Sequence, residues 1–385
     1  MKEERKIKAI VCGTTFGQFY CEALRRMPEI LFDGILSTGS VRSQRCAERY
    51  GVRSYTAADE LPEDIQLACV AVRSGVLGGN GTELAAALLE RGIHVIQEQP
   101  VHYKDAERCI RIAKQHGVCY RVGDLYEYLP NIRCFLESAR AICRVSGPVY
   151  LDIGAASQVT YPLIRILAEA LPSVRPFEIR QVSAETHPYD AVSASVAGIP
   201  AMFQIQNEVA PDDPDNFMHY LHRITIVTAH GRLCLDDTTG SVVWYHQMFV
   251  PVHDPEAGLQ MREEAAGPVG LPQLVRLYPA KAQSFQELFR TEWIPAISAD
   301  IQSFLRLISD GTAAETAAMY TKTVHAAKMW HTLTAALGFP ALVRAARKDH
   351  TEIARTVQQL QKTFSETENS DERELYRGPA PDGAA

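Results

Sequence analysis

The stretch of the chain best suited to chemistry runs from Gly92 to His102. It begins as a short apolar run rich in β-branched residues and turns polar at residues 98–102, which is typical of a buried parallel strand where it leaves its sheet. In open α/β folds, ligands bind at the carboxyl ends of such strands. Gln99 is a neutral amide and cannot deliver a proton, whereas the imidazole of His102 can. We therefore expect a ligand, and chemistry on it, at this strand end.

A glycine turn near the N-terminus predicts a second part of the same site. Residues 7–12 form a predicted strand, and the turn at residues 13–17 leads into an amphipathic helix at 18–26. Free backbone N–H groups and the helix dipole at such a turn favour an anion, as in the pyrophosphate site of a dinucleotide-binding fold. The glycine spacing departs from G-x-G-x-x-G, and an ordinary tight strand–helix turn would have the same pattern.

The elements that follow favour the dinucleotide site. Strand and helix patterns alternate at residues 7–12, 18–26, 32–37, 42–50, 66–72, 81–91, 93–98, 104–116 and 118–123. Such alternation predicts a parallel, doubly wound sheet. We therefore predict an α/β protein with a Rossmann dinucleotide-binding domain at residues 1–123. Its cofactor phosphates are expected at Gly13, Thr14, Thr15, Phe16 and Gly17.

The end of the second predicted strand indicates which dinucleotide binds. An NAD-binding fold usually has Asp or Glu there to bind the ribose 2′-hydroxyl. Residues 35–43 contain no acid, but they contain Arg42 and the hydroxyls of Ser37, Ser40 and Ser43. A carboxylate would repel a 2′-phosphate, whereas an arginine with serines beside it can hold one by charge-assisted hydrogen bonds. We predict NADPH, although the same serines also suit the N-cap of the next helix.

The segment after the predicted strand at 66–72 is rich in glycine. Residues 73–82 have the sequence Arg-Ser-Gly-Val-Leu-Gly-Gly-Asn-Gly-Thr. Glycines permit a close approach of the backbone to a flat ligand. A flexible loop before the next helix is the alternative. We predict that Arg73 and Ser74 contact the cofactor, with Glu98, Gln99 and Pro100 beside its nicotinamide.

The second half of the chain predicts a different sheet. A helix at 131–145 precedes strands at 148–154, 177–184, 200–208, 222–229, 232–236 and 241–249, with hairpin turns at 229–231 and 237–240. This pattern predicts a substrate-binding α+β domain, residues 124–361, with a mostly antiparallel sheet open on one face and helices at 281–309 and 313–336. Because open-faced sheets commonly pair, we expect a homodimer. Residues 362–385 are polar and charged and are predicted to form a flexible tail.

Composition excludes several classes of function. The net charge of −7 and the lack of a basic block argue against a nucleic-acid partner. No apolar run approaches the roughly 20 residues that span a membrane, so no membrane association is predicted. Nine cysteines without a Cys-x-x-Cys pair indicate a reduced, cytoplasmic protein. His219 and His222 have a metal-like spacing but lack a third ligand, so we predict no metal site.

Several segments together resemble one family of enzymes. They are Val11–Tyr20, the loop at 73–82, Glu98–His102, Ala210–Asp215, Leu221–Arg223, Val243–Trp244 and Met248–Val250. This combination is similar to the thiazolinyl imine reductases of siderophore biosynthesis, a branch of the glucose–fructose oxidoreductase/inositol dehydrogenase (Gfo/Idh/MocA) family. The similarity extends from about residue 7 to about residue 345. The combination is specific, although no single segment is.

The resemblance implies an activity. Members of the branch use NADPH to reduce the C=N bond of a thiazoline to a thiazolidine, on a peptide tethered to a carrier protein of a nonribosomal peptide synthetase. The parent family has a Glu-Lys-Pro motif whose lysine serves acid–base catalysis. Gln99 stands in place of that lysine, where the branch usually has histidine.

The resemblance also implies the catalytic residues. Tyr126 corresponds to the tyrosine of the branch that is thought to donate a proton, so His102 and Tyr126 are the predicted catalytic residues. Packing or a hydroxyl hydrogen bond at a domain hinge is the alternative role of Tyr126. Tyr128 is then the second choice of donor.

Two other functions are weighed against imine reduction. Sugar- and polyol-oxidising relatives carry an Asp and a His, in the helix predicted at 160–171, that hold the hydroxyl being oxidised, and this helix has neither. A site without those groups cannot easily take a proton from an alcohol, which argues against a sugar or cyclitol dehydrogenase. Loss of the lysine also suits a non-catalytic ligand sensor, but the retention of His102 and Tyr126 favours an enzyme.

Overall fold

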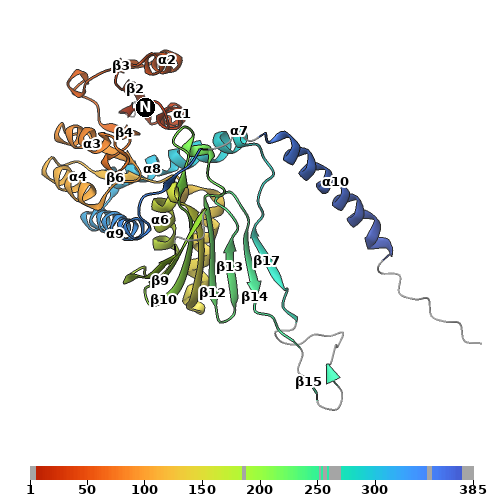
Figure 1. The fold of residues 1–385 in the computed structure, drawn as a ribbon. Coiled ribbons are helices and arrows are strands. Elements are labelled where there is room, and N and C mark those ends of the chain that lie inside the picture. The colour runs from red at the N-terminus through yellow and green to blue at the C-terminus, as the bar shows by residue number, and fades with distance from the viewer. Residues whose placement is uncertain are drawn as a thin grey trace, which may run out of the picture. The chain divides into compact units, whose positions relative to one another are not determined.

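The structure is a computed structural model, and it describes residues 6–183, 188–250, 253–254, 258–259, 270–344 and 349–374. Its contacts divide the chain into two compact units. The larger unit contains the residues up to Val209 and Met218–Leu342. The smaller contains Ala210–Phe217 and the residues from Val343 onward. Both predicted sheets belong to the larger unit (Figure 1).

The first sheet is parallel throughout, with the strand order β3-β2-β1-β4-β5-β6. Its strands are β1 (Ile7–Cys12), β2 (Ile30–Leu36), β3 (Arg53–Tyr55), β4 (Leu67–Val70), β5 (His94–Glu98) and β6 (Tyr120–Gly123). Connecting helices are α1 (Gly17–Arg26), α2 (Val41–Tyr50), α3 (Gly81–Glu90) and α4 (Tyr103–Gln115). The strand order reverses between β1 and β4, so their carboxyl ends border the crevice where such folds bind ligands. The predicted Rossmann domain is confirmed, and only the short β3 had not been predicted.

The second sheet has eight strands in the order β17-β14-β13-β12-β7-β10-β9-β8, with a single parallel pair, β7 and β10. The strands are β7 (Pro148–Ala156), β8 (Phe177–Ser183), β9 (Tyr189–Val196), β10 (Ile199–Gln206), β12 (His222–Thr228), β13 (Gly231–Leu235), β14 (Val242–His246) and β17 (Leu274–Tyr278). In β12, buried residues alternate with partly exposed ones, so one face packs on the core and the other is open. The predicted open-faced, mostly antiparallel sheet is confirmed, with β9 and β17 in addition.

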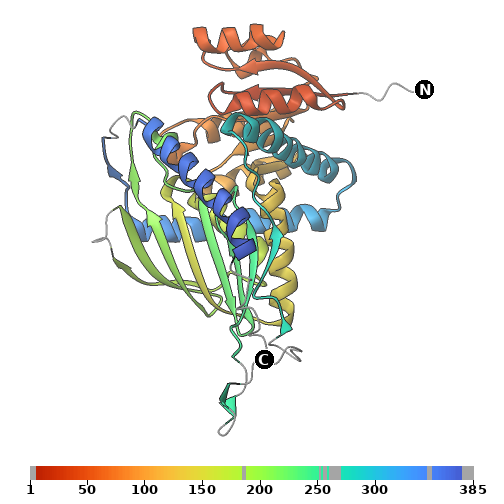
Figure 2. The ribbon, with the colours of Figure 1, turned by 90° about the vertical axis from the view of Figure 1, so that its right-hand side faces the viewer.

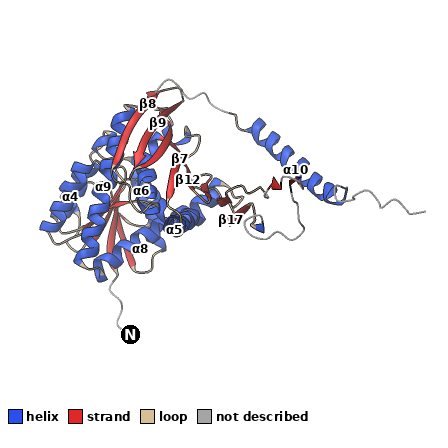
Figure 3. Ribbon diagram, turned by 90° about the horizontal axis from the view of Figure 1, so that it is seen from below, coloured by secondary structure: helices blue, strands red, loops and turns tan. Residues whose placement is uncertain are grey.

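Helices cover the buried face of this sheet. They are α5 (Pro130–Val145) and α6 (Thr160–Ala170), which contact β13 and β7, and they lie along one face of the sheet (Figures 2 and 3). The predicted helix at 281–309 is broken in the structure. A short α7 (Phe285–Leu288) starts at a capping box and passes through a π-helical turn, Phe289–Trp293, into α8 (Ile294–Asp310).

The long helix α9 (Ala313–Leu337) connects the two sheets of the larger unit. It packs on α4 and α6 and contacts β6 and β8. Two short pairs of strands lie outside the two large sheets: β11 (Glu208–Val209) with β18 (Ala341–Leu342), and β15 (His253–Asp254) with β16 (Gly258–Leu259). No helix within the described ranges is long and apolar enough to cross a membrane.

The smaller unit contains a helix that the sequence did not predict. It is α10 (Thr351–Glu374), and residues 362–374 of the predicted tail belong to it. Residues 375–385 lie outside the described ranges. The flexibility of residues 362–385 and the domain boundary at residue 123 stay predictions.

Candidate cofactor and active site

The glycine turn between β1 and α1 has the features of a phosphate site. Phe16 is the N-cap of α1, and no side chain caps that helix end, so the positive end of the helix dipole lies at this turn. The N–H groups of Gln18 and Phe19 donate to the carbonyls of Thr15 and Phe16 at 3.4 and 3.0 Å. Gly13 has a φ of +90°, and a Cβ there would lie 2.7 Å from the carbonyl oxygen of Ala71. Only glycine therefore fits at this position. The predicted residues 13–17 thus form one turn at the carboxyl end of β1.

The serines predicted to bind a 2′-phosphate have partners within the chain. Ser40 is the N-cap of α2, and its Oγ accepts from the backbone N–H of Ser43 at 3.3 Å. The Ser43 hydroxyl donates to the Ser40 carbonyl at 2.7 Å, and Ser37 Oγ accepts from the Gly39 N–H at 3.3 Å. Arg42 lies in the first turn of α2 and is exposed. Capping explains Ser40, Ser37 and Ser43 make other local hydrogen bonds, and the guanidinium of Arg42 is accessible to an anion.

The glycine-rich loop at 73–82 folds on itself. A Cβ at Gly79 or Gly81 would collide with the carbonyl groups of Arg73 or Val72, so these glycines are needed for packing within the loop. The buried hydroxyl of Ser74 donates to the Pro100 carbonyl at 2.6 Å. Ser74 therefore ties this loop to the end of β5, and the side chain of Arg73 is exposed.

The end of β5 contains both an ordered and an unsatisfied polar group. Tyr20 donates to the carboxyl of Glu98 at 2.6 Å, and burial, opposed by this hydrogen bond, raises the pKa of Glu98 to about 8. The side-chain oxygen of Gln99 is buried and has no hydrogen-bond partner. Such an atom is an acceptor for a ligand group. Gln97, which the sequence analysis did not single out, is buried between Thr82 (3.1 Å) and the Tyr120 hydroxyl (2.8 Å).

His102 is the N-cap of α4. Its Nδ1 accepts from the backbone N–H of Lys104 at 3.3 Å, so the neutral ring carries its proton on Nε2. Burial, and then the neighbouring His331, lower the pKa of His102. The imidazole is therefore mostly neutral at neutral pH, with Nε2–H available as a donor.

Tyr126 lies in the turn that follows β6. Its backbone N–H donates to Asp124 at 2.9 Å, and its ring packs edge-on against His222, with ring centroids 5.2 Å apart. The ring of Trp293 also contacts Tyr126, with ring centroids 6.2 Å apart, and its centroid lies 6.5 Å from that of Phe16 in the glycine turn. Trp293 therefore contacts both Tyr126 and Phe16 of the predicted phosphate turn, whereas His102 packs on α9.

His222 is a core residue that supports Tyr126. It is fully buried, with Nε2 2.8 Å from the Val159 carbonyl and Nδ1 2.7 Å from the Thr238 hydroxyl. Because a carbonyl can only accept, Nε2 carries the proton and Thr238 donates to Nδ1. Burial lowers the pKa of His222 to about 4, so the ring is neutral. Among the described residues, no three His, Cys, Asp or Glu side chains could hold a metal ion together.

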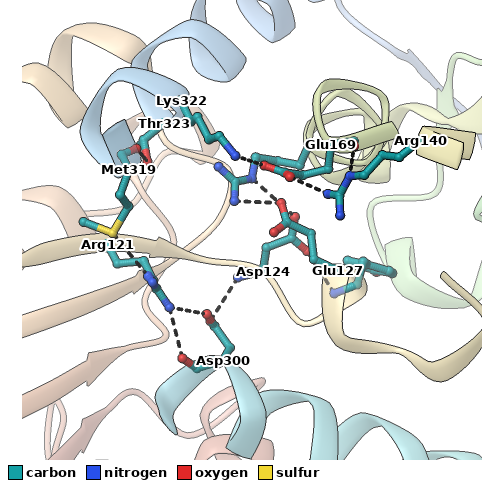
Figure 4. Close-up of polar contacts among 11 residues, drawn as sticks. Arg121, Asp124, Glu127, Arg140, Glu169, Asp300, Met319, Lys322 and Thr323 are labelled. Atoms are coloured by element: carbon teal, nitrogen blue, oxygen red, sulfur yellow. Dashed lines mark hydrogen bonds and ion pairs between the residues drawn. The ribbon is translucent and has the colours of Figure 1, made fainter. Parts of the chain in front are cut away.

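The segment between β6 and α5, residues 124–129, crosses from the first sheet to the second and carries Tyr126. A charged network holds this crossover segment (Figure 4). Asp300 of α8 pairs with Arg121 at 3.0 Å and accepts from the Asp124 N–H at 3.3 Å. Arg165 of α6 pairs with Glu127 at 2.7 Å. Burial raises the pKa of the carboxyl groups of Asp124, Glu127 and Asp300, and the positive charges of Arg121 and Arg165 oppose this rise. The crossover is thereby bound to α6 and α8.

The same network lines a cavity of about 290 Å³, whose charged residues include Arg121, Asp124, Arg165, Glu169 and Lys322. Lys322 of α9 pairs with Glu169 at 2.7 Å, and Arg165 reaches the crossover from α6. Sequence patterns missed this cluster because its members lie in separate elements. A charged residue within an otherwise apolar helix, such as Arg165, was the signal that could have indicated it.

Comparison with known families decides which proteins this chain is related to. Residues 7–124 match the oxidoreductase family with an NAD-binding Rossmann fold, GFO_IDH_MocA, and residues 146–245 match the C-terminal domain of Irp3-like thiazolinyl imine reductases. The chain belongs to the Gfo/Idh/MocA oxidoreductase family. Its second domain places it in the thiazolinyl imine reductase branch. No curated protein matches the chain.

Several solved structures of enzymes share this fold. KijD10, a 3-ketoreductase from Actinomadura kijaniata in complex with NADP, has a TM-score of 0.60 at 16% identity, covering 85% of this chain and 96% of its own. An oxidoreductase from Agrobacterium radiobacter in complex with NAD+, L-tartaric acid and magnesium has a TM-score of 0.59 at 12% identity, and the match covers 84% of this chain and 94% of its own. UDP-N-acetylglucosamine 3-dehydrogenase GnnA from Acidithiobacillus ferrooxidans has a TM-score of 0.57 at 14% identity, and the match covers 86% of this chain and 99% of its own. At these identities the similarity shows the fold alone.

The residues of this Gfo/Idh/MocA oxidoreductase fit a nicotinamide cofactor. The uncapped start of α1 and the close-packed Gly13 suit a pyrophosphate, and the unsatisfied Gln99 oxygen lies at the strand end where the nicotinamide is expected. Those residues would hold the pyrophosphate and the nicotinamide of the dinucleotide. The family's Glu-Lys-Pro lysine is absent, so acid–base chemistry here requires other side chains.

Proposed function

We propose that this chain is an NADPH-dependent imine reductase that converts a thiazoline ring to a thiazolidine. The observation that carries the proposal is the match of residues 146–245 to the C-terminal domain of thiazolinyl imine reductases. Gln99 supports it, because an amide at the position of the parent family's lysine leaves no base there to take a proton from an alcohol. The expected substrate is a siderophore intermediate tethered to a carrier protein of a nonribosomal peptide synthetase.

The proposed cofactor is NADPH rather than NADH. One solved structure of this fold contains NAD+ and another contains NADP, so the fold alone does not determine which of the two cofactors binds. The exposed guanidinium of Arg42, at the positive end of α2, suits a 2′-phosphate. When bound, NADPH supplies the hydride for the thiazoline carbon.

Tyr126 is the proposed source of the proton. Hydride addition to the carbon of a C=N bond leaves negative charge on the nitrogen, which must be protonated by a group within hydrogen-bond reach. Phenols carry their proton at neutral pH, so a tyrosine can donate without tuning. The hydrogen bond from the Tyr126 backbone to Asp124, and the packing of its ring on His222, hold this residue in one orientation.

His102 has a different proposed role. Its lowered pKa keeps the imidazole mostly neutral at neutral pH, and a neutral imidazole is a poor acid. With Nδ1 engaged by Lys104, the Nε2–H can donate a hydrogen bond to the substrate. His102 would thus orient the thiazoline, while Tyr126 protonates it.

The test uses the purified full chain, NADPH, and a thiazoline presented free or attached to a carrier protein. Loss of NADPH absorbance that depends on the thiazoline, with the thiazolidine identified by mass spectrometry, is the expected result. Turnover should be faster with the carrier-bound form. NADPH binding without turnover of either form would indicate a sensor. Efficient oxidation of inositol or glucose with NADP+ would refute the assignment.

A further inference from the structure

Two histidines from distant parts of the chain meet beside the candidate site. His102 lies at the start of α4, and His331 lies near the end of α9. Their ring centroids are 4.9 Å apart and their planes are almost perpendicular, at 87°. The two helices lie side by side (Figures 1 and 3). The contact therefore depends on how α9 packs against the Rossmann domain.

Side chains from both α4 and α9 surround this pair of histidines. The ring of Tyr103 lies 4.4 Å from that of His102 and 5.4 Å from that of His331. The Lys328 ammonium lies over the Tyr103 ring at 5.4 Å and pairs with Glu107 at 2.8 Å. The groups that act on the charge of His102 come from both helices: Lys104, Asp105 and Glu107 of α4, and His331 of α9.

Packing alone does not explain a histidine at position 331. Its neighbours on α9, Trp330 and Leu333, are buried, whereas His331 is partly exposed. Within the described part of the chain, its ring nitrogens make no hydrogen bond. A leucine or phenylalanine would supply the same contact surface to His102. Unlike these residues, a histidine at position 331 places an ionisable ring in contact with the ionisable ring of His102.

We propose that His331 is a positioning residue for His102. Its ring fixes the plane of the His102 imidazole, and at most one of the two rings carries the second proton that makes it an imidazolium ion. Two imidazolium ions in contact would repel each other strongly, so a proton on His331 disfavours one on His102. This keeps His102 as the neutral Nε2–H donor. The inference rests on the proposed function, since it concerns how His102 meets the thiazoline.

The first test does not depend on turnover. The chain is labelled with ¹³C-histidine, the His102 signal is assigned by its loss in His102→Gln, and the pKa of His102 is measured by NMR. Removing the neighbouring charge in His331→Gln should raise that pKa. The matched control is His325→Gln, on the same helix, whose ring contacts Arg175 instead. It should leave the pKa of His102 unchanged.

A second variant keeps the ring contact but removes the ionisable group. In His331→Phe the pKa of His102 should rise as in His331→Gln, which keeps the inference testable if His331→Gln does not fold. An unchanged pKa of His102 in either folded variant would overturn the inference.

The second test uses the proposed reaction. Protonation puts a second N–H on Nδ1 of His102, which can then no longer accept from the Lys104 N–H, so the ring leaves this orientation. The rate should therefore rise with pH as the His102 imidazolium loses its Nδ1 proton. In His331→Gln this acidic limb should move to higher pH, and in His325→Gln it should not. An acidic limb that stays in place would overturn the role of His331. Absence of thiazoline turnover in the wild type would refute the proposed function and leave the NMR result standing.

Discussion

Replacement of Glu98 by glutamine tests the electrostatics at the end of β5. Folding raises the pKa of the Glu98 carboxyl from 4.5 to about 8, chiefly by burial. The folded chain therefore holds a proton that the unfolded chain loses. The stability that this proton contributes is complete below about pH 4.5 and is lost as pH rises through about 8. Glutamine cannot ionise but can still accept from the Tyr20 hydroxyl.

The size of the effect follows from the two pKa values. Their difference of about 3.5 corresponds to about 5 kcal/mol if the carboxyl is fully shielded. Glu98 retains some exposed surface, and solvent screens part of this interaction. We therefore expect wild-type protein to lose about 2 kcal/mol more stability than Glu98→Gln between about pH 5 and about pH 8.

Urea unfolding of both proteins at these two pH values measures this difference. Glu83→Gln is the matched control, because Glu83 is an exposed carboxyl paired with Arg108 and its pKa is lowered. Because it retains Glu98, that control should lose stability toward alkaline pH as the wild type does. Equal pH dependence of wild type and Glu98→Gln would show that the Glu98 carboxyl is ionised at neutral pH in the folded protein.

Substitutions at four further positions test the proposed site. Arg42→Ala should reduce the preference for NADPH over NADH by roughly tenfold or more, measured as dissociation constants at fixed ionic strength. Arg45→Ala, one turn farther along α2, should not; equal affinity of the wild type for both cofactors would sink the NADPH assignment. Tyr126→Phe and His102→Ala should each lower kcat at least about tenfold with little change in NADPH affinity. Near-normal kcat in both would mean that protonation comes from solvent or substrate. Gln99→Ala should retain measurable turnover, and Gln99→Lys should not gain alcohol oxidation, which an assay with inositol checks.

Local patterns in the sequence determined most of the fold. The alternation of short apolar runs with amphipathic segments was sufficient to predict the Rossmann sheet, because each strand and helix is encoded by residues close together in the chain. Polar residues at the end of residues 93–98 indicated the ligand edge for the same reason. The pattern was weakest where a strand is short or rich in small residues, as in β3 and β9, or where a helix changes its winding at Phe289–Trp293.

Only the tertiary structure decided how the polar groups are used. Ser40 caps α2, the Ser43 hydroxyl donates to the Ser40 carbonyl, and the Ser74 hydroxyl donates to the Pro100 carbonyl. Hydroxyls in suitable positions thus have partners within the chain. The ion pair of Arg121 with Asp300 joins residues 179 positions apart. The contact of His102 with His331 likewise depends on where α9 packs. Such contacts have no local signature, because they arise when separately encoded elements bury their apolar faces against each other and bring distant side chains together.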